Sequence, residues 1–114
     1  MRDKVNDPAR LVLMKESIAN IYEFLKDVND RESFISNKIL CHAVIYNLQC
    51  IGESVYKLSK DFRLSHADMN WDKIEGLRHV LVHDYYTIDL TAVWYIIEKD
   101  LPALKNYLIQ FDNS

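Results

Sequence analysis

Residues 77–86 combine the side chains that phosphate chemistry needs. Arg78 carries a permanent cation with a planar set of N–H donors that fits phosphate oxygens. His79 and His83 can take up or release a proton near neutral pH, and Tyr85 and Tyr86 add two phenols. An arginine and a histidine suffice to cleave a phosphodiester bond without a metal ion. The sequence holds no glycine-rich phosphate loop, Cys-x-x-Cys or His-Glu-x-x-His motif that would compete with this stretch.

The spacing of these residues limits how they can act together. A regular helix turns about 100° per residue, so Arg78 and Tyr85 share one face, as do His79 and His83. Arg78 and His83 point about 140° apart on such a helix. We therefore expect either that the helix ends near His83, or that a second copy of the chain completes the site. A two-fold dimer in which these helices face each other would also place two arginines in one cleft.

The same stretch carries a family resemblance. Arg78, His83 and Tyr85 form the pattern R-x4-H-x-Y, which resembles the motif of the HepT-like toxins in the HEPN superfamily of small helical ribonucleases. Three further segments are similar to that family: Leu-Gln-Cys-Ile-Gly-Glu-Ser at 48–54, Trp-x-x-Ile-x-Gly-Leu at 71–77, and the closing helix with Val-Trp at 93–94 and Asp-Leu-Pro-x-Leu at 100–104. The family often has Asn directly after the arginine, where this chain has His79.

The resemblance implies a metal-independent endoribonuclease that needs no cofactor and acts as a homodimer with the motif at the subunit interface. In the mechanism that we expect, His83 takes the proton from an RNA 2′-hydroxyl, which attacks the adjacent phosphorus while Arg78 holds the non-bridging oxygens. The products would be a 2′,3′-cyclic phosphate and a 5′-hydroxyl end, and DNA would not react. His79 would add a phosphate contact or act as the acid for the leaving oxygen.

The resemblance also implies a partner. HepT-like toxins belong to toxin-antitoxin systems in which a nucleotidyltransferase antitoxin of the MntA type adds AMP to the tyrosine of the motif, here Tyr85. Added phosphate on a phenol that shares the face of Arg78 would occupy the cation and fill the cleft. Tyr85 is therefore the predicted site of inactivation.

Each of these residues also has a structural explanation. Arg78 could pair with Glu75 one turn earlier, and His83 could cap a helix end. His79 and His83, spaced i and i+4, could hold a metal ion, although a nearby third ligand is missing from the sequence. The two tyrosines could be packing residues.

The net charge of −3 argues against a simple nucleic-acid binder. It favours the rival hypothesis of a non-catalytic helical subunit that binds a nucleotide or RNA and docks a nucleotidyltransferase. A third alternative is a purely structural helical dimer. Expression separates the first two, because a toxin would halt the growth of a host and its His83→Ala variant would not.

The scaffold is predicted to be all-α, an up-and-down bundle of four main helices with a possible short fifth. Apolar residues recur at spacings of three and four in a first helix over about 8–27, opened by Asp7 and Pro8. A turn with a short helical piece near Ser33 precedes a long second helix opened by Asn37. Residues 59–70 lack a clean period and are expected to form a connection. Asn70 and Asp89 are predicted to open the last two helices.

Three positions in these helices point to special contacts. Gly52 inside the long helix weakens it by about 1 kcal/mol, which suggests that another backbone approaches closely there. Glu53 is either a solvated carboxylate or the partner of an Arg or Lys on an adjacent helix. Pro102 removes a backbone donor, so a kink is expected near residues 98–101.

Length and composition complete the expectation. The 114 residues, with two glycines and two prolines, indicate one domain over residues 1–114. Cys41 and Cys50 lie nine residues apart on one helix, too far to bridge, and are expected to be reduced. The sequence has no apolar run long enough to span a membrane and no apolar signal segment at its start, which predicts a cytoplasmic protein.

Overall fold

The computed structural model describes residues 6–78 and 89–111, and over these residues the chain is helical without a strand. In chain order the α-helices are α1 (Asp7–Phe24), α2 (Arg31–Ile35), α3 (Lys38–Tyr56), α4 (Lys60–Ser65), α5 (Trp71–Glu75), α7 (Leu90–Tyr95) and α8 (Leu101–Leu108). A π-helical turn, η2 (Ile96–Asp100), joins α7 to α8, and a 3-10 turn, η3 (Ile109–Phe111), follows α8. The predicted all-α fold is confirmed.

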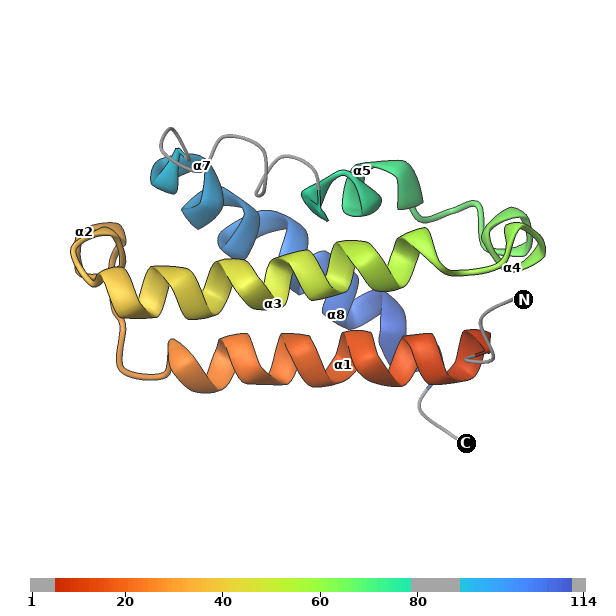
Figure 1. Cartoon of the computed structure of the whole chain (residues 1–114), viewed down its shortest axis with the longest axis horizontal. Coiled ribbons are helices and arrows are strands. Elements are labelled where there is room, and N and C mark those ends of the chain that lie inside the picture. Colours follow the sequence, from red (N-terminus) through yellow and green to blue (C-terminus); the bar gives the residue numbers. More distant parts are fainter. Residues whose placement is uncertain (1–5, 79–88, 112–114) are drawn as a thin grey trace.

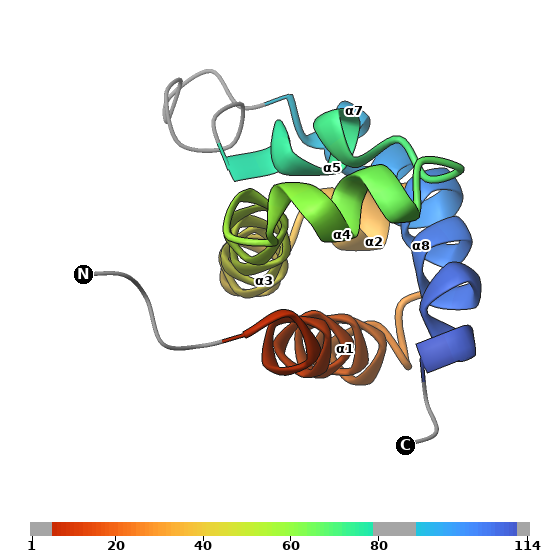
Figure 2. The ribbon, with the colours of Figure 1, turned by 90° about the vertical axis from the view of Figure 1, so that its right-hand side faces the viewer.

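The two longest helices, α1 and α3, lie side by side and run in opposite directions (Figure 1). Helix α5 packs on α3 on the side away from α1, and α8 packs against α1 (Figure 2). The core between them is made of the aliphatic stripes predicted from the helical period. Its fully buried members include Met14, Ile21, Val44, Leu48 and Leu104. Burial of these faces, and not helix propensity, holds such short helices in place.

Side chains at the helix starts set the boundaries. In six helices a side-chain oxygen of Asn, Asp or Ser accepts a hydrogen bond from a backbone N–H of the first turn. The predicted caps Asn37, Asn70 and Asp89 are confirmed by these bonds.

The start of α1 differs from the prediction by one residue. Asn6 caps the helix with a 3.2 Å bond from the Ala9 N–H, whereas Asp7 lies inside the first turn. The carboxylate of Asp7 instead accepts from the backbone N–H and the hydroxyl of Ser59, at 2.8 and 2.7 Å. Asp7 is thus used in a tertiary contact that joins the start of α1 to the cap of α4.

Helix α4 and the π-helical turn η2 bear on two predictions about the scaffold. Residues 59–70 were expected to be a plain connection, but Ser59 caps a six-residue helix, α4, which was too short for a period to be visible. The π-helical turn η2 stands directly before Pro102, where a kink was predicted. The proline has no N–H for the carbonyl four residues earlier, so regular α-helical bonding is interrupted there.

The cysteines and the helix lengths bear on two further predictions. Cys41 and Cys50 are free thiols, as predicted. Among the described residues, no helix is both long and apolar enough to cross a lipid bilayer.

Candidate functional site

Gly52 of α3 sets the position of Arg78. Leu77 and Arg78 are helical and follow α5, which packs on α3. A Cβ atom built on Gly52 would lie 2.7 Å from the backbone nitrogen of Arg78 and 3.2 Å from the Glu75 carbonyl oxygen. The close backbone approach predicted from Gly52 is therefore confirmed, and its partner is the segment that carries the arginine.

The Arg78 guanidinium lies against the end of α3. Its Cζ atom is 3.7 Å from the centroid of the Tyr56 ring, and its Nη1 atom is 3.6 Å from Oε1 of Glu53. The first contact is a cation–π stack, while the second is a long ion pair between half-buried side chains that are 24% and 46% exposed. One face of the guanidinium is thus fixed by an aromatic ring.

The Nε atom of Arg78 is buried without a hydrogen-bond partner among the described residues. A buried N–H donor without an acceptor costs about 1–3 kcal/mol. The arginine is positioned by its neighbours without its donors being used up.

The pairing of the carboxylates settles two alternatives. Glu75 does not pair with Arg78, because Arg63 of α4 holds it at 2.8 Å and holds Asp72 at 2.7 Å. The explanation of Arg78 as a partner of Glu75 was wrong. Glu53 does fix an arginine on an adjacent helix, and it also lies 3.7 Å from the Lys57 ammonium.

The other predicted site residues, His79, His83 and Tyr85, lie outside the described residues, as does Tyr86. Their arrangement around Arg78 stays a prediction. In the part of the chain that is described, no group of three His, Cys, Asp or Glu side chains is placed to hold a metal ion.

Tyr56 is the residue near Arg78 that sequence reasoning missed. Its signal was present, because Tyr56 lies three residues after Glu53 and hence on the same face of α3. Helix α3 carries two other large apolar side chains that are exposed: Ile39 is 83% and Tyr46 65% exposed, compared with 50% for Tyr56. These residues form what we call the outer stripe of α3, which runs from the start of the helix to Arg78.

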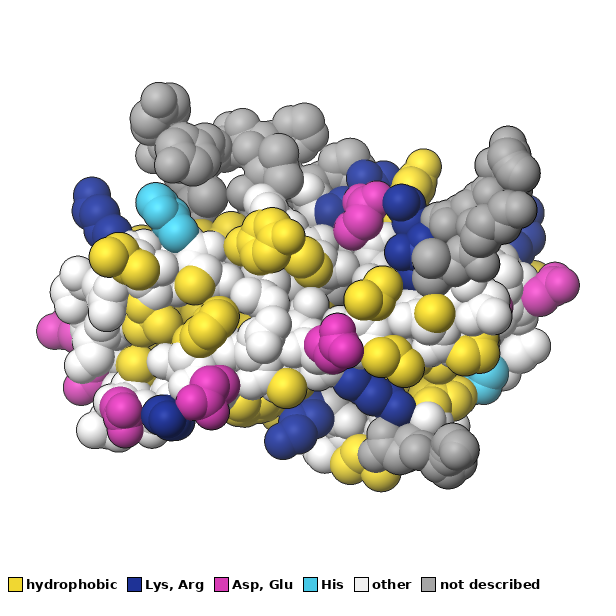
Figure 3. All heavy atoms as spheres, turned by 60° about the horizontal axis from the view of Figure 1, so that its bottom comes forward, with side chains coloured by type: hydrophobic (Ala, Val, Ile, Leu, Met, Phe, Trp, Pro, Cys, Tyr) yellow, Lys and Arg dark blue, Asp and Glu magenta, His cyan; other side chains and the backbone are white. Residues whose placement is uncertain are grey.

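The charges visible on one side of the molecule are mixed. Figure 3 shows lysines and arginines separated by carboxylates and apolar side chains, without a continuous basic area on that face. This distribution agrees with the net charge of −3.

Comparison with known proteins identifies the family. A family model described as "Ribonuclease HepT-like" matches residues 14–111. The chain belongs to the HepT-like ribonuclease family. The resemblance read from Arg78, His83 and Tyr85 is thereby confirmed, as is the prediction of a ribonuclease at the level of the family.

Relatives carry matching names. "Putative RNase MJ1380" of Methanocaldococcus jannaschii is 39% identical, covering 79% of this chain and 82% of that protein. "Probable ribonuclease HepT" of Thermococcus cleftensis is 32% identical over 79% of this chain and 81% of that protein. The M. jannaschii protein "Gamma-glutamylcyclotransferase and putative RNase MJ0434" is 33% identical, but the HepT-like chain spans only 42% of its length. No solved structure matches the chain.

Proposed function

We propose that this HepT-like protein is the toxin of a toxin-antitoxin system and an endoribonuclease that cleaves RNA without a metal ion. The observation that supports it most directly is the state of Arg78: the guanidinium is stacked on Tyr56, it is 3.6 Å from its carboxylate neighbour, and its Nε has no partner among the described residues. Such a cation can donate hydrogen bonds to phosphate oxygens without breaking a short ion pair.

In the proposed reaction, His83 removes the proton of a 2′-hydroxyl, and the resulting oxygen forms a bond to the adjacent phosphorus. The bond from phosphorus to the 5′-oxygen breaks, and that oxygen takes a proton, with His79 as the candidate acid. Arg78 stabilises the charge that develops on the non-bridging oxygens. A 2′,3′-cyclic phosphate and a 5′-hydroxyl result, so the bonds and protons balance without a further reactant.

The deciding experiment is incubation of purified protein with total cellular RNA in the presence of EDTA. Arg78→Ala and His83→Ala should each lower the rate by about 10²–10⁴-fold, the range for loss of one catalytic group. Arg31→Ala, which removes an exposed arginine on α2, is the matched control and should cleave normally. A substrate with a single 2′-deoxynucleotide at the cut site should resist.

The same assay tests the rival function, a non-catalytic subunit that binds RNA or a nucleotide and docks a nucleotidyltransferase. The acidic net charge favours that alternative. It predicts no cyclic phosphate product from the wild type and an unchanged host on expression. Equal cleavage by the wild type and His83→Ala would instead indicate a contaminating nuclease and refute the proposal.

A homodimer is part of the proposal. The outer stripe of α3 holds three exposed apolar side chains and ends at the Tyr56 and Arg78 stack, and a two-fold interface there would bring two arginines together. Tyr46→Glu should shift sedimentation towards the monomer and reduce cleavage at low protein concentration. Tyr95→Glu, at a tyrosine that is 53% exposed on α7, should change neither. A wild type that sediments as a monomer at assay concentration would contradict the dimer.

The proposed antitoxin is a nucleotidyltransferase that adds AMP to Tyr85. Co-expression with a nucleotidyltransferase encoded beside this chain should increase its mass by one adenylyl group and abolish cleavage. Tyr85→Phe should escape modification, whereas Tyr86→Phe, the neighbouring control, should not. Silencing of Tyr85→Phe without a mass change would show that the partner acts by covering the cleft.

A further inference from the structure

A groove between α1 and α8 is lined by residues of these two helices and by Ile109, and by none of the outer stripe of α3. Its volume is about 500 Å³, within the range of small-molecule sites. It shares no residue with the surroundings of Arg78, and RNA cleavage does not use it. The groove would also stay open in a dimer formed through the outer stripe.

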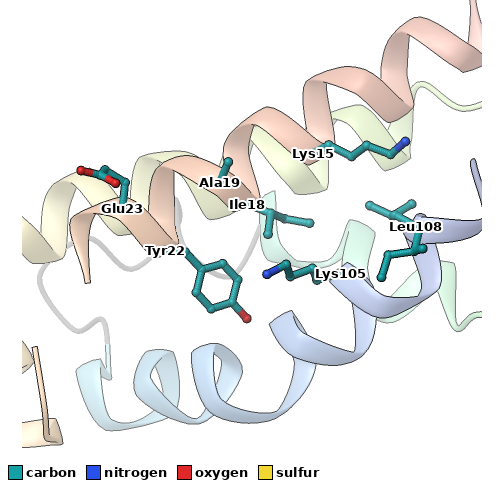
Figure 4. Close-up of a pocket in the computed structure, with 8 residues that line it drawn as sticks. Lys15, Ile18, Ala19, Tyr22, Glu23, Lys105 and Leu108 are labelled. Atoms are coloured by element: carbon teal, nitrogen blue, oxygen red, sulfur yellow. The ribbon is translucent and has the colours of Figure 1, made fainter. Parts of the chain in front are cut away.

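The floor of the groove is apolar. Ile18 and Leu108 lie at its base and are almost fully buried (Figure 4). Ala19 and Ile109 also line it and are exposed. Ile109 is 56% exposed. A hydrophobic ligand body placed here would remove this apolar surface from water, at about 25 cal/mol for each Å².

Two lysines, Lys15 and Lys105, lie at the rim. The Lys105 ammonium lies 4.6 Å from the centroid of the Tyr22 ring, and Lys15 Nζ donates to the Phe111 carbonyl at 3.0 Å. Among the described residues that line the groove, Glu23 is the one carboxylate, and the Lys26 ammonium lies 2.9 Å from it. The exposed ammonium of Lys105 favours an anion at this end of the groove.

Tyr22 does not oppose this charge. Its ring borders the groove beneath Lys105, and burial raises the pKa of its phenol above the usual 10. The phenol is therefore neutral at physiological pH and offers a flat surface without repelling an anion.

We propose that the groove binds a planar hydrophobic anion, with its ring system on Ala19, Tyr22 and Ile109 and its phosphate or carboxylate at Lys105. A nucleoside monophosphate and an aromatic carboxylate share this chemistry. Inorganic phosphate would bind without the free energy of the apolar contacts. An uncharged ring would bind without the free energy of the interaction with lysine.

Two fluorescent probes separate these contributions. Anilinonaphthalene sulfonate combines an aromatic ring system with a negatively charged sulfonate group, whereas N-phenylnaphthylamine has the aromatic rings without a charge. The intact protein should bind the sulfonate at one saturable site and the neutral probe about tenfold more weakly or not at all. Equal binding of both probes, or no saturable binding of the sulfonate, overturns the proposal.

Variants then assign the site. Lys105→Met keeps the aliphatic stem and removes the charge, so the dissociation constant for the sulfonate should rise about tenfold. Ala19→Phe, at an exposed helical position, should fill the groove and abolish binding. Lys99→Met, at an exposed lysine on η2 outside the groove, is the control and should bind like the wild type. If the three variants bind alike, the probe is bound elsewhere.

Competition identifies the source of the anion. Displacement of the sulfonate by adenosine monophosphate and not by naphthoate points to a nucleotide, and the reverse points to an aromatic acid. Displacement by inorganic phosphate alone at the same concentration overturns the proposal, because the apolar floor would then contribute nothing. RNA cleavage by Lys105→Met should equal that of the wild type, so failure here is distinct from failure of the proposed nuclease.

Discussion

The backbone nitrogen of Arg78 lies where a side chain on Gly52 would have to be: a Cβ there would stand 2.7 Å from it. Glycine weakens the interior of α3, yet its absence of a side chain lets the arginine-bearing segment sit directly on that helix. The position of the candidate catalytic cation therefore depends on a residue 26 positions earlier in the chain.

Gly52→Ala should destabilise the protein. The methyl group gains about 1 kcal/mol of helix propensity but forces backbone atoms apart, and overpacking of this kind costs about 1–3 kcal/mol. RNA cleavage should fall by more than the loss of folded protein explains, because Arg78 is displaced. Urea unfolding and cleavage rates measure the two effects.

Gly76→Ala is the matched control for that substitution. Its Cβ would meet the nearest carbonyl oxygens at 3.4 and 3.5 Å, which is ordinary contact, and Gly76 has right-handed helical backbone angles. It should leave stability unchanged or improve it by up to about 1 kcal/mol. Equal destabilisation by both alanines would show that the contact between Gly52 and Arg78 is not the cause.

Tyr56→Leu should reduce RNA cleavage about two- to fivefold, because an exposed cation–π stack contributes about 0.5–1 kcal/mol to holding the guanidinium. Tyr56→Phe retains the ring and should cleave like the wild type. Initial rates at matched protein concentration make the comparison. An equal loss in Tyr56→Phe would assign the effect to the hydroxyl group and not to the stack.

Asp7→Ala should lower the free energy of unfolding by about 1–2 kcal/mol, since its carboxylate accepts two hydrogen bonds from Ser59. Ser59→Ala should cost more, because its hydroxyl also accepts from the Phe62 N–H as the cap of α4. Asp27→Ala, at an exposed acid after α1, is the control. A double variant with fully additive losses would contradict direct coupling of Asp7 and Ser59.

Tyr107 should make stability depend on alkaline pH. Burial, together with the 2.6 Å hydrogen bond that its hydroxyl donates to Asp68, raises the pKa of Tyr107 to about 12. The folded chain holds this proton more tightly than the unfolded chain, whose phenol has the usual pKa of 10. The resulting stabilisation is complete below pH 10 and is lost as the pH rises towards 12.

The Tyr107→Phe variant tests this pH dependence. Its chemical denaturation midpoint should be lower than that of the wild type at pH 8, and the difference should shrink between pH 10 and 12. Tyr95→Phe, at an exposed tyrosine, should follow the wild type at every pH. A difference between Tyr107→Phe and the wild type that stays constant to pH 12 would contradict the assigned pKa.

Much of the scaffold could be predicted because its causes are local. The cap at Asn37 and the buried stripe through Val44, Leu48 and Ile51 arise within a few residues of chain, where helical geometry alone decides which groups meet. The short helix α4 was missed because six residues show too few turns for a period. Asp7 was misassigned as a cap because its partner, Ser59, lies 52 residues away.

The sequence alone predicted the family and the helical scaffold, and it named the candidate residues for phosphodiester cleavage, since these follow from residue types and short spacings. The tertiary structure decided which partner each charge takes. Glu75 is closer to Arg78 in the sequence than Glu53 is, but it forms an ion pair with Arg63 of α4. Arg78 instead contacts Glu53 and Tyr56 of α3. Packing of one helix on another chooses between such partners, because the competing charges come together only when the chain has folded.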